Sequence, residues 1–272
     1  MTMVAASDDA KILGVFERLA LTAGRKVMDV FHAGCSVDKK SDQSPVTEAD
    51  RESEKIILAG LREAFPSIPC VAEEEAAAGT APCSVGSAFF LIDPLDGTKE
   101  FINRNTDFTV NIALVRDGIP EIGVVYAPCT QRFFSGRPGS AELVELNDVG
   151  EIARRHPMRV RPGATPLTIV ASRSHRTPET DDFIGKVGAA EIVSVGSSLK
   201  FCLVANGEAD IYPRFGRTME WDTAAGDAVL RAAGGSTSTL DGKPLGYGKC
   251  NQASDCDFAN PYFIARGNVT GH

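Results

Sequence analysis

The sequence has no long hydrophobic run, no basic leader and no paired set of cysteines. Nowhere do about 18 uncharged apolar residues follow one another, as a transmembrane helix requires. The seven cysteines are odd in number and none are spaced as C-x-x-C, which disfavours a zinc knuckle and a full disulfide framework. We therefore expect a cytoplasmic protein with reduced thiols, no signal peptide and no transmembrane segment. Peripheral association with a membrane surface stays open.

The sequence also has no excess of basic residues. There are 28 Lys and Arg against 36 Asp and Glu, so the formal net charge is −8. A surface that holds DNA or RNA needs clustered positive charge, and the acidic balance therefore excludes nucleic acid as a partner. The same balance says nothing about one small anionic ligand in one pocket. At 272 residues the chain is long enough for one or two domains.

The spacing of apolar residues predicts a chain that mixes helices and strands. Helices are expected over residues 7–34, 47–65, 178–187, 197–206 and 222–233, and strands over 70–72, 88–92, 108–115, 121–126, 167–171, 192–195 and 209–212, with further strands near the C-terminus. Asp117-Gly118 is typical of a hairpin turn. Residues 136–165 carry the weakest pattern, and a subdomain boundary is expected near 155–165.

The segment from Leu91 to Phe101 carries the sharpest chemical signal. An apolar strand runs into Asp93-Pro-Leu-Asp96-Gly-Thr98, and two carboxylates at the end of a buried strand are costly unless a cation lies between them. Carboxylate and carbonyl oxygens suit Mg²⁺, and the Leu95 carbonyl lies in the same turn. Gly97 and Thr98 then open a helix whose free N–H groups suit a phosphate. The structural alternative is an Asp-Gly turn with a capping aspartate.

Three further acidic positions are candidates for the same site. Glu73 follows a short apolar strand and begins the run Glu73-Glu74-Glu75, although such a run is more often a solvated loop. Asp222 lies in Trp-Asp-Thr-Ala-Ala-Gly at the first turn of a helix, where it could equally be a helix cap. Asp50 ends Thr-Glu-Ala-Asp, which also fits a capping box.

Taken together, these clusters resemble the inositol monophosphatase superfamily of Mg²⁺-dependent phosphatases. The resemblance rests on Asp93–Thr98, Pro45–Asp50, Glu73-Glu74 and Trp221–Gly226, and extends over roughly residues 10–265. It implies an α+β fold, a layered αβαβα sandwich. In that fold an N-terminal half, residues 1–160, carries most metal ligands. A C-terminal half, residues 161–272, carries the specificity residues and the last ligand, and both halves form one catalytic unit.

Within this superfamily the chain is similar to 3′(2′),5′-bisphosphate nucleotidases of the CysQ type. The segments that carry this similarity are Asp96–Ile102, Phe108–Leu114, Gly123–Pro128, Ser172–His175, Gly196–Val204 and Tyr212–Gly216. The resemblance implies that the metal ligands are the side chains of Glu73, Asp93, Asp96 and Asp222 with the Leu95 carbonyl. It also implies two or three Mg²⁺ ions that activate water, and sensitivity to lithium.

The resemblance assigns the remaining roles to the water and the substrate. Thr98, with Asp50 or Glu73 behind it, would orient and help to deprotonate the attacking water. No nucleophilic serine or cysteine is needed, because phosphoryl transfer depends mainly on positioning and charge neutralisation. The expected substrate contacts are Gly97, Thr98, His175, Gly196, Ser197, Ser198, Lys200, Arg214 and Asp222.

The choice of substrate is expected to depend on positions in the C-terminal half. Gly196-Ser197-Ser198 forms a candidate phosphate nest before a helix, with Lys200 nearby, although an ordinary serine cap is the structural alternative. A lone His175 is also more often a satisfied loop residue. Arg214 offers donors for a second phosphate, where inositol-specific relatives carry an acidic residue.

The expected reaction is hydrolysis of the 3′-phosphate of 3′-phosphoadenosine 5′-phosphate to AMP and phosphate, which clears a by-product of sulfate assimilation. An inositol monophosphatase or a broad sugar-phosphate phosphatase is the alternative within enzymes. A non-catalytic binding partner of the transcription machinery is the alternative outside them, but it would need a docking face that the acidic balance does not suggest. Whether the chain forms a homodimer stays open.

Overall fold

The chain builds two β-sheets that are separated and covered by helices. The computed structural model describes residues 2–40, 43–82, 84–163, 165–174, 176–188 and 191–269. Its helices are α1 (Thr2–Ala33), α2 (Glu48–Ala64), α3 (Glu73–Ala77), α4 (Thr98–Ile102), α5 (Pro178–Val187), α6 (Leu199–Ala205) and α7 (Ala224–Ala232).

The strands form one large sheet, one smaller sheet and a short pair. The larger sheet has the order β3-β4-β5-β6-β7-β8-β9, the smaller one β11-β10-β12-β14-β13, and β1 pairs with β2. The strands are β1 (Val37–Lys39), β2 (Pro45–Thr47), β3 (Cys70–Ala72), β4 (Ala88–Asp96), β5 (Thr109–Arg116), β6 (Ile119–Ala127), β7 (Arg132–Arg137), β8 (Ser140–Leu146), β9 (Ile152–Pro157), β10 (Thr168–Ser172), β11 (Glu191–Val195), β12 (Ile211–Arg214), β13 (Ser236–Thr239) and β14 (Phe263–Arg266).

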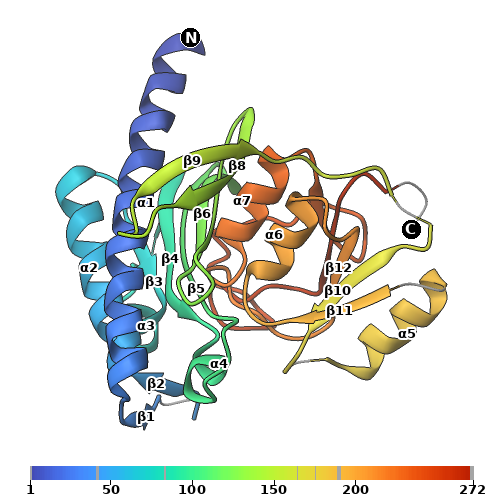
Figure 1. Cartoon of the computed structure of the whole chain (residues 1–272), viewed down its shortest axis with the longest axis horizontal. Coiled ribbons are helices and arrows are strands. Elements are labelled where there is room, and N and C mark those ends of the chain that lie inside the picture. Colours follow the sequence, from blue (N-terminus) through green and yellow to red (C-terminus); the bar gives the residue numbers. More distant parts are fainter. Residues whose placement is uncertain are drawn as a thin grey trace.

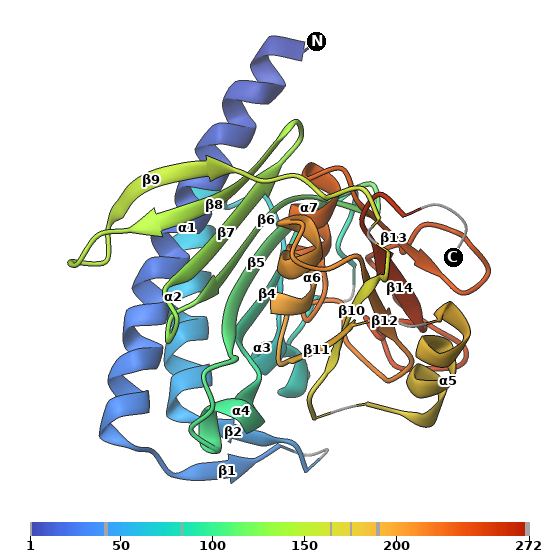
Figure 2. The ribbon, with the colours of Figure 1, turned by 45° about the vertical axis from the view of Figure 1, so that its right-hand side comes forward.

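Five layers stack in the order helix, sheet, helix, sheet, helix (Figures 1 and 2). Helices α1 and α2 pack together and cover one face of the seven-stranded sheet, whereas α7 packs on its other face. Helix α6 joins α7 to the five-stranded sheet, and α5 packs against β12 on the outer side. This arrangement confirms the predicted αβαβα sandwich. It puts two helices from the C-terminal part of the chain between the two sheets.

The central strands are buried on both faces because both faces carry helices. Phe89, Phe90, Leu91 and Ile92 of β4 are each at most 1% exposed, as expected for a strand with a continuous apolar run. The predicted hairpin is confirmed, since β5 and β6 pair antiparallel around Asp117-Gly118. Both turn residues have positive φ, as a two-residue hairpin turn requires.

The apolar pattern of residues 136–165 predicted no strands, but this stretch belongs to the larger sheet. It completes β7 and contains β8 and β9, which extend the sheet beyond the predicted hairpin. Pairing with a neighbouring strand, rather than an apolar pattern of its own, keeps β9 in place, because Ala153–Pro157 are all exposed. The first helix begins at Thr2, five residues before the predicted start at residue 7, and ends at Ala33, one residue before the predicted end.

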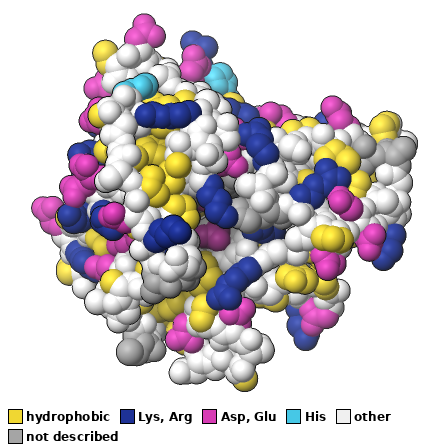
Figure 3. All heavy atoms as spheres, turned by 90° about the horizontal axis from the view of Figure 1, so that it is seen from below, with side chains coloured by type: hydrophobic (Ala, Val, Ile, Leu, Met, Phe, Trp, Pro, Cys, Tyr) yellow, Lys and Arg dark blue, Asp and Glu magenta, His cyan; other side chains and the backbone are white. Residues whose placement is uncertain are grey.

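The surface carries charges of both signs side by side. On the face that Figure 3 shows, Lys and Arg side chains are interspersed with Asp and Glu side chains. The protein therefore presents no single basic stripe on this face, in line with the acidic composition. Among the helices that the structure describes, none has the length and apolar character needed to cross a membrane.

Helix α7 lies so close to β6 that only glycine fits at the contact. A Cβ at Gly123 would lie 2.5 Å from the Ala225 carbonyl oxygen and 2.9 Å from the Ala228 Cβ. The first of these atoms belongs to the backbone and cannot rotate away. Gly123 therefore sets the depth at which α7 packs, and with it the position of the residues that precede α7.

We predict that Gly123→Ala lowers the free energy of unfolding by about 1–3 kcal/mol, because the added methyl must push α7 away from the sheet. Urea unfolding of the purified variant measures this change. Gly246→Ala is the matched control, since a Cβ there meets nothing within 4 Å. Equal stability of the two variants would contradict the close contact.

Candidate active site

The end of β4 turns two aspartates toward one cluster of carboxylates. Side chains of a regular strand alternate between faces, so residues three apart should point to opposite sides. Asp93 pairs with Asn111 and Asp96 with Thr109, so β4 has one residue more than β5 across this step. The resulting bulge re-aims one side chain. The Leu95 N–H donates to Asp93 Oδ1 at 3.0 Å and fixes the turn.

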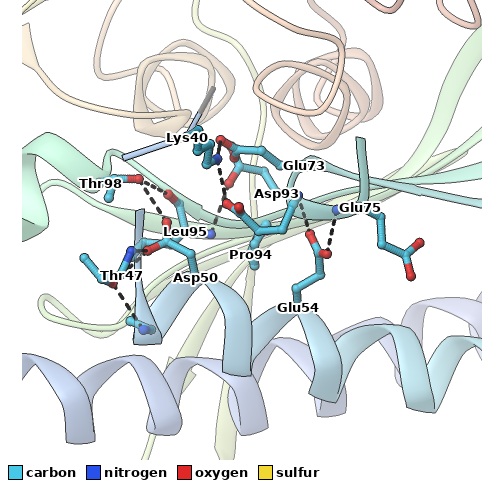
Figure 4. A network of polar contacts seen from close by, with 12 residues as sticks. Lys40, Thr47, Asp50, Glu54, Glu73, Glu75, Asp93, Pro94, Leu95 and Thr98 are labelled. Atoms are coloured by element: carbon cyan, nitrogen blue, oxygen red, sulfur yellow. Dashed lines mark hydrogen bonds and ion pairs between the residues drawn. The ribbon is translucent and has the colours of Figure 1, made fainter. Parts of the chain in front are cut away.

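Glu73 is brought to the same place by a short helix that α2 holds at its start. Glu73 follows β3, which pairs in parallel with β4. The Glu54 carboxylate of α2 accepts the backbone N–H groups of Glu74 at 2.8 Å and Glu75 at 3.0 Å, as Figure 4 shows. Burial, opposed by these hydrogen bonds, raises the pKa of Glu54 to about 7. A residue 19 positions upstream thus caps the helix that begins with Glu73.

Ser198 joins the two aspartates that come from different halves of the chain. Its hydroxyl lies 2.9 Å from Asp96 Oδ2 and 2.6 Å from the Asp222 carbonyl oxygen, and it accepts the Asn111 side-chain N–H at 2.9 Å. Ser198 is 2% exposed. Its hydroxyl is therefore engaged in joining Asp96 and Asp222, which favours a positioning role over a direct contact with phosphate.

The repulsion between the carboxylates of this cluster favours the binding of a cation. Burial, together with the charges of Glu73, Asp96 and Asp222, raises the pKa of Asp93 well above its usual range. Burial and Asp96 likewise raise the pKa of Asp222, and burial raises that of Asp96. Buried carboxylates that repel one another are the hard oxygen donors that Mg²⁺ prefers, so the donor set fits a divalent ion. Within the described ranges no three His, Cys, Asp or Glu side chains are already drawn into a metal-binding arrangement.

Lys40 supplies a positive charge that the sequence did not reveal. Its Nζ lies 2.5 Å from Glu73 Oε1 and 2.6 Å from Glu74 Oε1, and its side chain is 7% exposed (Figure 4). Although burial opposes it, the charges of Glu73 and Glu74 raise the pKa of Lys40 above its usual value. Lys40 lies in a polar loop with no distinguishing motif, so only the fold brings it to Glu73.

The predicted pair of Thr98 and Asp50 lies in contact beside the cluster (Figure 4). The Thr98 hydroxyl donates to Asp50 Oδ1 at 3.0 Å and lies 3.3 Å from the Leu95 carbonyl oxygen. Asp50 Oδ2 accepts the Thr47 N–H and hydroxyl, each at 2.7 Å, and completes a capping box at the start of α2. The capping box, which was the structural alternative for Asp50, is therefore present, and it leaves Oδ1 in contact with Thr98.

Lys40, Glu73, Asp96, Thr98 and Asp222 line one pocket of about 1070 Å³, whereas Asp93 and Asp50 lie behind these residues and are not part of its lining. Glu73, Asp96 and Asp222 contribute negative charge to its wall, and Lys200 and Arg214 contribute positive charge. Lys200 is 4% exposed and Arg214 is 8% exposed. Burial lowers the pKa of Lys200 to about 8, an effect that Asp96 opposes. Buried cations of this kind are costly unless they meet an anion.

The predicted substrate contacts differ in where they lie. Gly97, Thr98, Ser197 and Ser198 line the pocket with the charged residues named above. Gly97 has φ +97° and approaches the Asp107 carbonyl, so a side chain would be strained there. Gly196 is not among the lining residues, and its N–H donates to Asp107 Oδ2 at 3.0 Å. His175 lies outside the described residues.

The chain is similar to proteins of one family over nearly its whole length. The model of the inositol monophosphatase family matches residues 8–267. The 3′(2′),5′-bisphosphate nucleotidase CysQ of Escherichia coli K12 is 44% identical over 232 residues, which cover 85% of this chain and 91% of that protein. The CysQ protein of Buchnera aphidicola is 38% identical over 257 residues, covering 94% and 93%. The crystal structure of CysQ from Bacteroides thetaiotaomicron has a TM-score of 0.74 at 35% identity and covers 95% of this chain and 97% of that one.

The raised pKa values of the buried aspartates determine how we expect the free energy of unfolding to depend on pH. The pKa values of Asp93, Asp96 and Asp222 are raised by burial first, so in the folded state protons stay bound at pH values where the unfolded chain has released them. Without divalent cations, the free energy of unfolding should therefore fall as the pH rises from about 5 to about 7.5.

Mg²⁺ should flatten this dependence, because the cation binds the ionised form of the folded protein. Urea midpoints measured across this pH range, with chelator and with millimolar Mg²⁺, test the prediction. Glu52→Gln is the control, since Glu52 pairs with Lys55 on the surface and should leave the pH dependence unchanged. A stability that rises with pH in chelator would contradict the carboxylate cluster.

Proposed function

The chain belongs to the inositol monophosphatase family, and we propose that it is a Mg²⁺-dependent 3′(2′),5′-bisphosphate nucleotidase. It hydrolyses the 3′-phosphate of 3′-phosphoadenosine 5′-phosphate and releases AMP and phosphate. The CysQ relatives named above support this proposal by their names and their identity over most of the chain. The pocket supports it independently.

One observation carries the choice of a bisphosphate. The carboxylates of Glu73, Asp96 and Asp222 line the same pocket as the buried cations Lys200 and Arg214. The carboxylates can bind a phosphate only by way of divalent cations that lie between them and the phosphate. The guanidinium of Arg214 and the ammonium of Lys200 can bind a phosphate directly. Two chemically different anion sites in one pocket fit a substrate with two phosphates. A volume of about 1070 Å³ also leaves room for a nucleoside between them.

The carboxylate cluster would hold the cations. Glu73, Asp93, Asp96 and Asp222 provide side-chain oxygens, and the Leu95 carbonyl provides one from the backbone. When bound, Mg²⁺ would lower the pKa of a water and neutralise charge on the transferred phosphoryl group. Lys40 already pairs with Glu73 at 2.5 Å, so it would neutralise part of the remaining negative charge or yield its place to a cation.

Thr98 and Asp50 would orient the attacking water. Because the Thr98 hydroxyl donates a hydrogen bond to Asp50 at 3.0 Å, its lone pairs are free to accept a hydrogen bond from water. Asp50 is 0% exposed and is held by Thr47, so this direction is fixed before substrate binds. The pair therefore positions the water in line with the phosphate. No covalent intermediate on the protein is required.

Arg214 would bind the phosphate that does not react. Its guanidinium donates to the carbonyl oxygens of Gly216 at 3.2 Å and Arg217 at 2.9 Å, which holds the side chain in the pocket wall. A guanidinium has five N–H donors, so those contacts leave donors for a phosphate. Lys200, whose Nζ donates to the Ser197 carbonyl at 2.5 Å, adds charge on the same wall.

A substrate panel tests the proposal. The purified protein should hydrolyse 3′-phosphoadenosine 5′-phosphate with Mg²⁺ and lose the activity with chelator, and inositol 1-phosphate should be a poor substrate. A clear preference for inositol 1-phosphate would contradict the proposed substrate and would support the alternative, an inositol monophosphatase. No activity on any phosphate ester would favour a binding role. Inhibition by lithium and the number of bound ions stay predictions.

Asp93→Asn should lower kcat by about 10³-fold or more, because it removes a negative ligand at the centre of the cluster. The same change should leave the cation-free protein as stable as the original or more so, since it removes charge repulsion at a residue that is 1% exposed. Activity assays and urea unfolding in chelator separate the two effects. A variant that retains full turnover would refute the ligand assignment.

Arg214→Gln should lower kcat/KM for 3′-phosphoadenosine 5′-phosphate by about 10–100-fold, equivalent to about 1.4–2.8 kcal/mol, through the loss of a charge-assisted contact. Hydrolysis of 3′-AMP should change little, because that substrate lacks the second phosphate. The ratio of the two substrates serves as an internal control for folding. An equal loss on both would show that Arg214 does not read the second phosphate.

A further inference from the structure

Three polar residues lie directly behind the turn that carries Asp222. Glu220, Lys249 and Asn260 form this group, here called the Glu220 cluster, and none of the three lines the active-site pocket. Glu220 is 0% exposed and Asn260 is 6% exposed, and the Lys249 side chain is 22% exposed. Buried polar groups of this kind are costly unless every one is paired.

The Glu220 carboxylate is paired at both oxygens. Oε1 lies 2.6 Å from the Lys249 ammonium and accepts the Lys249 backbone N–H at 2.9 Å, and Oε2 accepts the Gly248 N–H at 2.7 Å. The Glu220 N–H donates to the Phe258 carbonyl oxygen at 2.8 Å, and the Phe258 N–H donates to the Lys249 carbonyl oxygen at 2.7 Å. These contacts join the segments around residues 220, 249 and 258 into one unit.

Asn260 connects this unit to both ends of the turn. The Lys249 ammonium donates to Asn260 Oδ1 at 3.1 Å. The Asn260 side-chain amide lies near three acceptors, namely the Met219 carbonyl at 2.8 Å, the Thr223 hydroxyl at 3.0 Å and the Thr218 hydroxyl at 3.2 Å. Its backbone N–H donates to the Thr218 carbonyl at 2.9 Å. Residues 218–223 are thus held from one side by a single amide.

The turn passes this constraint to Asp222 through one residue. The Met219 N–H donates to Asp222 Oδ2 at 2.8 Å, and the Asp222 N–H donates to the Met219 carbonyl at 3.2 Å. The same Met219 carbonyl accepts the Asn260 amide. Only Met219 therefore separates the cluster from the Asp222 carboxylate, so the cluster sets the direction in which this carboxylate enters the pocket.

We propose that Glu220, Lys249 and Asn260 are positioning residues that hold Asp222 in the orientation needed to bind a divalent cation. The proposal rests on the proposed function, in which Asp222 is a cation ligand. A buried ion pair adds little net stability compared with apolar residues of the same size, because desolvation offsets the attraction. In this protein the ion pair instead serves to fix the orientation of the Asp222 carboxylate. Partners behind a metal ligand typically change cation affinity by about 10–100-fold.

Glu220→Gln is the first test, because it keeps the shape of the side chain but removes the charge that pairs with Lys249. We expect the affinity for Mg²⁺, measured by calorimetry without substrate, to fall by about 10-fold or more. The Mg²⁺ concentration for half-maximal hydrolysis should rise by the same factor, and saturating Mg²⁺ should restore most of kcat. Asn260→Ala provides a second test at the other end of the cluster, and either variant that folds carries the test alone.

Asp210→Asn is the matched control. Asp210 is also buried, at 1% exposed, and its carboxylate is paired with the Arg161 guanidinium and with the Thr168 backbone N–H. It does not line the pocket. Asp210→Asn should lower the thermal midpoint and leave the affinity for Mg²⁺ unchanged. Glu220→Gln should change both.

The outcomes separate this proposal from the proposed function. If Glu220→Gln and Asn260→Ala lose stability but bind Mg²⁺ as tightly as the original protein, the cluster is structural only and the proposal is overturned, whereas turnover by the original protein still supports the nucleotidase. If the original protein binds Mg²⁺ but hydrolyses no phosphate ester, the proposed function fails. The calorimetric comparison then still decides the role of the cluster.

Discussion

The mutual repulsion of buried carboxylates is the constraint on which this structure depends. Burial first, and then the charges of neighbouring carboxylates including Glu73, raise the pKa values of Asp93, Asp96 and Asp222. A chain relieves such repulsion by moving the groups apart or by keeping protons on them. Here the carboxylates cannot move apart, because each is held from behind by a bulge in β4, by Glu54 at the start of α3, or by the turn before α7, so without a cation the three aspartates retain protons. A pocket held in this way favours a cation of high charge.

The layered fold brings the carboxylates together because α6 and α7 lie between the two sheets. The strand that ends at Asp96 belongs to the seven-stranded sheet, whereas Asp222 precedes α7 and Ser198 precedes α6. The contact of α7 with Gly123 fixes the depth of this middle layer. The hydroxyl of Ser198 then joins Asp96 to the Asp222 backbone. Because the residues of the site come from both halves of the chain, a change in how the halves pack would also change the distances between these residues.

Charges of both signs in one pocket resolve the apparent conflict between an acidic protein and an anionic ligand. The net charge of −8 excludes a broad surface for nucleic acid, but it does not describe the pocket. Buried Lys200 and Arg214 line the same pocket as the carboxylates that would bind cations. With cations bound, the pocket would offer phosphate two kinds of positive charge, one from side chains of the protein and one from the bound ions. That combination is the physical basis of the proposed preference for a bisphosphate.

The local sequence specifies which residue types are available to the site, whereas the packing of the layers sets the distances between them. Apolar periodicity predicted α1, α2 and the hairpin, and the resemblance to the inositol monophosphatase superfamily implied the layered fold. Neither indicated β9, since an exposed edge strand has no apolar pattern. The Asp93–Thr98 segment predicts a cation site because its residue types and spacing are local. Lys40 and the residues around Glu220 could not be found in this way. Their roles come from contacts between segments far apart in the chain, and only the packing of the layers decides which of them meet.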